Sequence, residues 1–282
     1  MADRDFNSSL CFVIPTSRCP RYPRTRKFGK FQRSRGNEFL GRFSKTPRTQ
    51  SQSQLKASLL ARRKFDENLT NNELALAFVG MSNSGKSFRS KKLAEELGFA
   101  LISVDEEIEK ALAEELGTLY GAGTDALASW MGFPYHETFR EREQRYLQIE
   151  EHVTYNARPT NKKNFALDTT GSVVYLSAEC QRKIRSEYLV VYLEIAESSL
   201  EEMIETFFAC PKPVVWGERF AASLDPISGE EKLRRCYPDL LHWRAQRYRE
   251  ISDVTVPSEV ARSREVSSQA FLDYVRLRLP TS

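Results

Sequence analysis

One stretch of the chain has the residue types and spacing of a nucleotide phosphate-binding loop: Gly80-Met81-Ser82-Asn83-Ser84-Gly85-Lys86-Ser87. In such a loop the backbone N–H groups surround the phosphates, and the positive end of the following helix adds to the attraction. The Lys86 ammonium would lie on the outer phosphates, and the Ser87 hydroxyl would ligate Mg²⁺. We therefore predict a site for a nucleoside triphosphate with Mg²⁺.

The flanking sequence supplies the elements that this loop needs. Residues 74–79 form a short apolar run typical of a buried strand, and residues 86–97 indicate a helix. The same alternation continues along the chain, which predicts an α/β fold with a parallel sheet and helices on both faces. Ligands of such sheets bind beyond the carboxyl ends of the strands. The further predicted strands are 99–104, 164–168, 188–195 and 254–256, and the further predicted helices are 105–116, 137–155, 176–186, 198–210, 240–251 and 269–279.

Further charged residues follow the predicted strands or lie in later helices. The stretches that carry them are Ser103-Val104-Asp105-Glu106-Glu107-Ile108-Glu109, Glu137-Thr138-Phe139-Arg140-Glu141-Arg142-Glu143 and Arg244-Ala245-Gln246-Arg247-Tyr248-Arg249-Glu250. Each also has an ordinary interpretation: Asp105 as a helix cap, and Arg140 and Arg244 as surface arginines. With the P-loop, in this order and spacing, residues 74–256 resemble the shikimate kinase family.

The resemblance implies a three-layer P-loop kinase fold, with a five-stranded parallel sheet of order 2-3-1-4-5, a mobile lid and a monomeric state. It implies ATP and Mg²⁺ as cofactors and a small-molecule acceptor. It places Asp105 at the substrate hydroxyls, and Arg140 and Arg244 at the substrate carboxylate. The lid step of the family resembles Lys212-Pro213 here, where lysine neutralises phosphate without a bidentate fork. Lys86, Asp105 and Lys212 are the predicted catalytic residues.

Two departures from the family pattern affect the metal and the acceptor. Ser103 stands where the family has the first Asp of Asp-x-Asp, and the family's Gly-Gly-Gly turn is Thr169-Thr170-Gly171 here, so that Gly171 alone remains for substrate binding. Asp168 ends an apolar strand, and we predict that it holds Mg²⁺ together with Ser87; its alternative role is to cap the next turn. Thr169 and Thr170 are expected to narrow the acceptor pocket and add hydroxyls. Trp216 either covers a ligand or packs down.

The front of the chain has a different composition. Residues 1–64 hold 16 Lys/Arg and 3 Asp/Glu, a balance of +13 against +4 for the whole chain, which leaves −9 for the remainder. We predict that residues 1–70 are disordered and that residues 71–282 form the kinase domain. An Arg- and Ser-rich, acid-poor segment is typical of an organelle transit peptide, and we predict import into a plastid in preference to a mitochondrion. A nucleic-acid-binding arm and a solvated tail are the alternatives; without import the protein would be cytoplasmic.

The predicted function is ATP- and Mg²⁺-dependent phosphoryl transfer to a hydroxyl of a small anionic metabolite, with shikimate as the leading acceptor. Another acceptor, such as a gluconate-like sugar acid or a nucleotide, is the first alternative. A catalytically silent ATP-binding regulator is the second, favoured by Ser103 and the altered glycine turn and opposed by the intact Gly85-Lys86-Ser87. No apolar stretch approaches the length of a membrane span, so no membrane partner is predicted.

Overall fold

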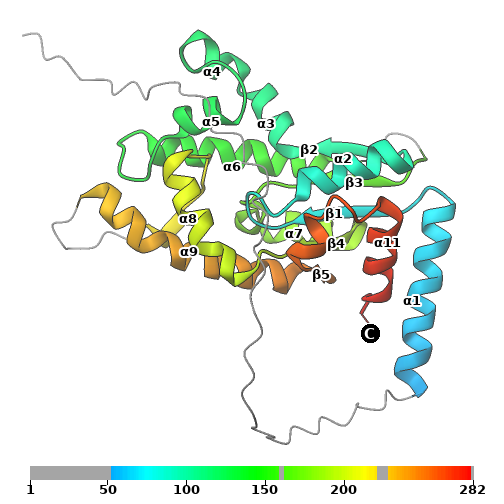
Figure 1. Cartoon of the computed structure of the whole chain (residues 1–282). Coiled ribbons are helices and arrows are strands. Elements are labelled where there is room, and N and C mark those ends of the chain that lie inside the picture. The colour runs from blue at the N-terminus through cyan, green and yellow to red at the C-terminus, as the bar shows by residue number, and fades with distance from the viewer. Residues whose placement is uncertain (1–51, 159–161, 221–227, 281–282) are drawn as a thin grey trace, which may run out of the picture. The chain divides into compact units, whose positions relative to one another are not determined.

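The structure is a computed structural model and describes residues 52–158, 162–220 and 228–280. Strands and helices alternate along it, as the sequence predicts (Figure 1). The strands are β1 (Ala75–Val79), β2 (Ala100–Ser103), β3 (Phe165–Asp168), β4 (Leu189–Leu193) and β5 (Val254–Val256). The α-helices are α1 (Gln52–Thr70), α2 (Lys86–Leu97), α3 (Val104–Ala111), α4 (Ala113–Tyr120), α5 (Thr124–Met131), α6 (Phe139–Asn156), α7 (Ala178–Glu187), α8 (Leu200–Ala209), α9 (Gly229–Ile251), α10 (Ser258–Ala261) and α11 (Ser268–Leu277). Short 3₁₀ turns are η1 (Val173–Tyr175), η2 (Glu197–Ser199) and η3 (Gly217–Arg219).

The five strands form one parallel sheet in the order β2-β3-β1-β4-β5, which confirms the predicted fold. β1 is central, and Phe78 lies beside Asp168 of β3, which lies in turn beside Ser103 of β2. Parallel strands bring their carboxyl ends to one edge of the sheet. The P-loop, Ser103 and Asp168 therefore meet at this edge.

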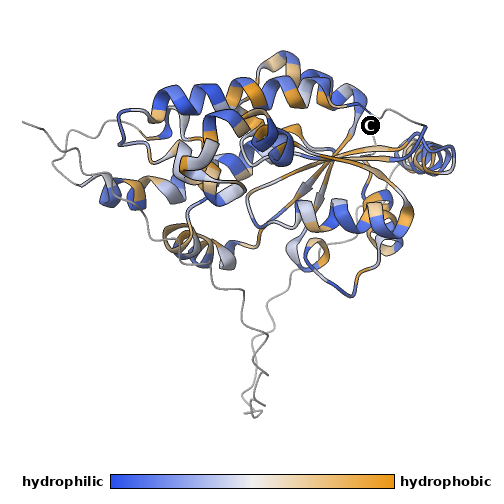
Figure 2. Cartoon of the chain, turned by 90° about the horizontal axis from the view of Figure 1, so that it is seen from above, coloured by the Kyte–Doolittle hydropathy of each residue, from blue (hydrophilic) through white to orange (hydrophobic). Residues whose placement is uncertain are grey.

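Alternating side chains of each strand enter two separate hydrophobic cores, one on each face of the sheet. On one face Leu76 and Phe78 of β1 pack with side chains of α1, α2 and α11. On the other face Ala77 and Val79 pack with side chains of α3 to α7 and α9. The strands are hydrophobic along their length, whereas the helices alternate hydrophobic and hydrophilic residues (Figure 2). This pattern gives the three predicted layers.

The helix α1 differs from the predicted disorder of residues 1–70. Gln52–Thr70 is helical, and α1 runs beside α11 (Figure 1). Phe65 is buried in the core that α11 shares, and Asp66 accepts two hydrogen bonds of 2.5 Å from Arg276. The disorder prediction rested on the basic composition of the whole front segment, and this average did not reveal a helix whose apolar face packs against α11. Residues 1–51, with the transit-peptide and nucleic-acid-arm hypotheses, lie outside the described residues.

Replacing Phe65 with alanine is expected to lower the free energy of unfolding by about 3 kcal/mol, because the buried ring fills space between α1 and the sheet core. The matched control is Leu60→Ala on the same helix, since Leu60 is 57% exposed and its loss should change stability by no more than about 0.5 kcal/mol. Urea unfolding of both variants measures the difference. Equal stabilities would show that α1 is not part of the folded domain.

Three other predicted boundaries differ from the structure. The helix predicted over 240–251 begins at Gly229 and contains Pro238, and the stretch predicted as loop from Gly117 to Pro134 contains α5. The helix predicted over 105–116 is divided into α3 and α4 at Leu112. Within the described ranges, no helix combines the length and the hydrophobicity that a membrane crossing requires.

Candidate active site

The backbone of the P-loop has a shape that its glycines make possible. Gly80 has φ +148° and Gly85 has φ +101°, values that side-chain-bearing residues rarely adopt. A Cβ on Gly80 would lie 2.7 Å from the Leu193 carbonyl oxygen, and one on Gly85 would lie 3.1 Å from the Ala261 carbonyl oxygen. Gly85 is also the N-cap of α2. The loop thus presents the start of α2, with its unpaired N–H groups, at the carboxyl edge of the sheet.

Lys86 folds back over the loop. Its Nζ donates hydrogen bonds to the carbonyl oxygens of Gly80 at 2.9 Å and Met81 at 3.0 Å, and its side chain is buried. Burial lowers the pKa of Lys86, while the nearby carboxylates of Asp168 and Asp105 oppose that effect. The ammonium is therefore held at the loop by two carbonyls, and the charges of Asp168 and Asp105 favour its protonated form.

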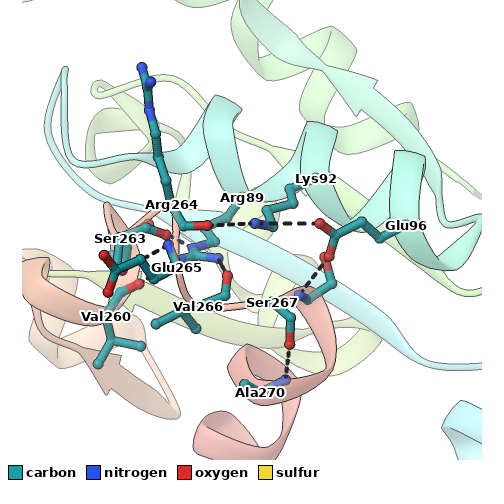
Figure 3. A network of polar contacts seen from close by, with 12 residues as sticks. Arg89, Lys92, Glu96, Val260, Ser263, Arg264, Glu265, Val266, Ser267 and Ala270 are labelled. Carbon is teal, nitrogen blue, oxygen red and sulfur yellow. Dashed lines mark hydrogen bonds and ion pairs between the residues drawn. The ribbon is translucent and has the colours of Figure 1, made fainter.

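The helix α2 is anchored by Arg89, a residue that the sequence reasoning did not select. Arg89 is 1% exposed and donates hydrogen bonds to four main-chain carbonyls of α10 and of the connection from α10 to α11 (Figure 3). Lys92 on the same helix donates to the Arg264 carbonyl, and Glu96 accepts from the backbone N–H of Ser268. The α10–α11 connection is thereby fixed against Gly85. The four acceptors of Arg89 are the carbonyl oxygens of Ala261, Val266, Val260 and Ser263.

Two carboxylates near the carboxyl ends of neighbouring strands lie close enough to Lys86 to raise its pKa. Asp168 ends β3, and Asp105 lies in the first turn of α3, which directly follows β2. Burial raises the pKa of both groups, while Lys86 opposes the rise at each. The predicted N-cap role of Asp105 belongs instead to Ser103, whose hydroxyl accepts from the Glu106 N–H at 3.4 Å. Ser103 is in register with Asp168, so the Asp168 carboxylate lies one strand away from the position where the shikimate kinase family has the first Asp of Asp-x-Asp.

Both carboxylate oxygens of Asp168 are buried and have no hydrogen-bond partner. The Ser87 hydroxyl is near enough to oppose the rise in the pKa of Asp168, although no hydrogen bond of good geometry joins the two. A buried carboxylate without partners is costly unless a ligand completes it. A hydroxyl beside a carboxylate at a P-loop fits Mg²⁺, which takes few protein ligands and keeps waters and phosphate oxygens. In the described ranges no group of three or more His, Cys, Asp or Glu residues forms a metal cage.

Arg244 on α9 lies at the opposite side of this edge. It is 6% exposed, its Nη2 donates to the Val215 carbonyl at 2.5 Å, and its buried Nε has no partner. A Cβ placed on Gly171 would lie 3.4 Å from Arg244 Nη1 and 3.7 Å from the backbone nitrogen of Ser82. Gly171 therefore stands between the P-loop and the guanidinium.

Lys212 comes from the irregular segment between α8 and η3, where the lid was predicted. Its Nζ donates to the Asn83 side-chain oxygen at 3.2 Å, and its charge lowers the pKa of Lys86. The lid segment thus touches the phosphate loop. Trp216 in the same segment packs down: it is 1% exposed, and its ring centroid lies 5.5 Å from that of Tyr237. Of the two interpretations of Trp216, packing is the one observed.

The structure does not bring Arg140 into the buried cluster. Its side chain is 65% exposed, and its Nη1 lies 3.6 Å from the Glu218 carboxylate on η3. It lies in the first turn of α6 on the solvent side, where Glu218 supplies the opposite charge.

The hydroxyls of Thr169 and Thr170, which were expected at the acceptor pocket, form hydrogen bonds inside the protein. Thr169 donates to the Phe78 carbonyl at 2.7 Å, and Thr170 donates to the Glu150 carboxylate. Both residues are buried, so the expectation that their hydroxyls line the acceptor pocket is wrong. Each hydroxyl takes the internal acceptor that burial demands.

Sequence comparison with known proteins points to one class. No protein-family model matches the chain. A shikimate kinase of Mannheimia succiniciproducens is 26% identical over 182 residues, which is 64% of this chain and 83% of the relative. One of Actinobacillus succinogenes is 24% identical over 191 residues, covering 68% and 89%. Among solved structures, shikimate kinase from Acinetobacter baumannii in complex with shikimate is 22% identical, with a TM-score of 0.39 and coverage of 75% and 93%.

The strand order and the P-loop of this chain define an α/β P-loop kinase fold. The sequence relatives confirm that this P-loop kinase is shikimate kinase-like, as the motifs predict.

Proposed function

We propose that this chain transfers a phosphoryl group from ATP to a hydroxyl of a small anionic metabolite, with Mg²⁺, and that shikimate is the acceptor. The observation that carries the proposal is the position of Gly171, where an added Cβ would lie 3.4 Å from Arg244 Nη1 and 3.7 Å from the P-loop nitrogen of Ser82. An acceptor bound to Arg244 at this point would have its hydroxyl next to the outer phosphate. Such positioning accounts for most of the catalysis of phosphoryl transfer.

The charges of the site suit the two substrates. Lys86 and Lys212 would bind phosphate oxygens, and Arg244, whose buried Nε has no hydrogen-bond partner, would bind the acceptor carboxylate. Asp105 would orient the acceptor hydroxyl and take its proton as the oxygen attacks phosphorus. Ser87 and Asp168 would hold Mg²⁺, which neutralises charge on the phosphate oxygens when bound.

Shikimate is the first acceptor to test because the curated relatives carry that activity in their names. At 26% identity and below, related acceptors need a direct comparison. Purified protein with Mg·ATP should be assayed for ADP release with shikimate, gluconate and nucleoside monophosphates. Turnover with shikimate at least about tenfold above the others supports the proposal. Preference for another acceptor would identify a related kinase, and ATP binding without turnover would identify a regulator.

The two arginines should respond differently to the same substitution. Arg244→Lys keeps the charge but removes the planar fork, and we expect the KM for shikimate to rise at least about tenfold with little change in the KM for ATP. Arg140→Lys should change it by less than about threefold, because Arg140 is exposed and paired with Glu218. Steady-state kinetics measure both. An Arg140 effect as large as that of Arg244 would mean that Arg140 leaves Glu218 when the acceptor binds.

The basic front of the chain supports a proposal about location. We propose that it is an organelle-targeting segment, with a plastid as the preferred destination over a mitochondrion. We also propose that it is cleaved before Gln52, because α1 belongs to the folded part of the chain: it packs against α11, and Asp66 pairs with Arg276. A fusion of residues 1–51 to a fluorescent protein tests this. Import with cleavage supports it, whereas a diffuse or nucleic-acid-bound fusion contradicts it.

A further inference from the structure

The carboxyl of Glu150 lies wholly inside the protein, beneath the turn that carries Gly171. It accepts hydrogen bonds from the Thr170 hydroxyl and, at 2.5 Å, from the Ser172 hydroxyl. The Ser172 N–H also donates to the Thr170 hydroxyl at 3.0 Å. Glu150 therefore fixes the residues on both sides of Gly171. A turn of three glycines would offer no side chains for such hydrogen bonds.

One turn earlier on α6, Tyr146 donates its hydroxyl to Asp105 at 3.4 Å. Residues four apart lie on the same face of a helix, so Tyr146 and Glu150 project together from α6. Burial raises the pKa of Tyr146 well above its ordinary value, so its hydroxyl remains a donor at neutral pH. One helical face thus contacts both the candidate proton acceptor and the candidate acceptor-binding turn.

Resting on the function proposed above, we infer that Tyr146 and Glu150 are positioning residues that hold Asp105 and the Thr170–Ser172 turn at a fixed separation, and so set which acceptors reach Asp105. Tyr146 acts through Asp105, and Glu150 acts through Thr170 and Ser172, which flank Gly171 near Arg244. A buried, fully hydrogen-bonded network of this kind gives one defined geometry. In this chain it takes the place of the missing glycines.

The charge state of Glu150 gives this arrangement a pH signature. Burial raises the pKa of Glu150 to about 7. The hydrogen bonds from Ser172 and Thr170 oppose this rise, and so does the charge of Arg244 on α9, whereas the charge of Asp105 on α3 adds to it. Tyr146 on its own helix, Tyr248 on α9 and Cys180 on α7 also face it. Ionised Glu150 accepts from both hydroxyls, whereas protonated Glu150 loses one acceptor site. The turn should therefore be best ordered above pH 7 and loosen as the pH falls through that value.

The test uses the full chain with Tyr146→Phe, Glu150→Gln and, as a control, Glu141→Gln at an exposed position of the same helix. With Mg·ATP and shikimate, Tyr146→Phe should lower kcat about tenfold with the KM for ATP unchanged. The wild type should show an inflection of kcat/KM near pH 7, and Glu150→Gln should abolish it and raise the KM for shikimate about tenfold. Glu141→Gln should behave as the wild type.

Amide hydrogen exchange keeps the inference testable if shikimate is not the acceptor. Protection of the Thr170–Ser172 amides should fall about tenfold in Glu150→Gln relative to Glu141→Gln, while the β1 amides and Mg·ATP binding are unchanged. Wild-type protein that binds Mg·ATP but leaves shikimate unphosphorylated would contradict the proposed function alone. Unchanged protection of this turn, a persistent pH inflection in Glu150→Gln, or loss of nucleotide binding in both α6 variants would overturn the positioning role.

Discussion

Lys86→Met protein is expected to fold and to lose phosphoryl transfer by at least about a hundredfold, the scale seen when a preorganised donor to developing charge is removed. Lys86 is the buried ammonium at the loop, held by the carbonyls of Gly80 and Met81. Methionine has a similar length without the charge. The loop backbone depends on Gly80 and Gly85, so its shape should persist. Steady-state rates with Mg·ATP and shikimate measure the loss, and circular dichroism verifies the fold.

The control for this prediction is Lys110→Met, which removes an exposed lysine paired with Glu107 on α3. It should keep wild-type turnover within about twofold, since exposed ion pairs contribute little. Wild-type activity in Lys86→Met would contradict a phosphate-binding role of the loop, whatever the acceptor is.

Asp168→Asn is expected to remove Mg²⁺-dependent turnover by about a hundredfold or more without lowering the stability of the protein free of ligand. Both carboxylate oxygens of Asp168 are buried without hydrogen-bond partners, and burial raises the pKa of Asp168 despite the opposing charge of Lys86, so ionised Asp168 carries a net cost in the folded protein until a cation binds. Activity measured against the Mg²⁺ concentration tests the first part. Urea unfolding without Mg²⁺ tests the second.

The pH dependence of the Asp168→Asn effect has a definite sign. Burial raises the pKa of Asp168 in the folded protein, so folding favours its protonated form. Wild-type stability should therefore fall relative to Asp168→Asn as the pH rises from the unfolded pKa, and the difference should vanish at lower pH. Mg·ATP should raise the melting temperature of the wild type more than that of the variant. A less stable variant with normal Mg²⁺ dependence would mean that Asp168 is only a structural cap.

The fold could be predicted because several segments of the chain have residue types that favour one local structure. The apolar strand β1, the glycines of the P-loop and the helix after them carry their structure in their own residue types. The predicted start of α9 at residue 240 is wrong, because the helix begins at Gly229 and continues through Pro238. Helix α1 was missed because its stability comes from Phe65 and Asp66 meeting α11, contacts that its composition does not reveal.

The candidate site was predicted in part for the same reason. Asp168 ends β3, and Lys86 and Asp105 begin the helices that follow β1 and β2, so the topology of the sheet brings the three residues together. Arg140 and Glu150 both belong to the charged helix α6, and the sequence selected the one that proves exposed. A glutamate among many charged residues looks solvated until the fold places two hydroxyls against it. Residues whose roles depend on tertiary contacts are those that single-sequence patterns leave unassigned.

The measurement that tests the account most directly is ³¹P NMR of the wild-type protein with Mg·ATP and shikimate. Transfer predicts that a new phosphomonoester resonance grows in step with ADP, and that it is absent when Lys86→Met replaces the wild type. Resonances of ADP and inorganic phosphate alone, or of unchanged ATP, would contradict the proposal that this site transfers phosphate to shikimate.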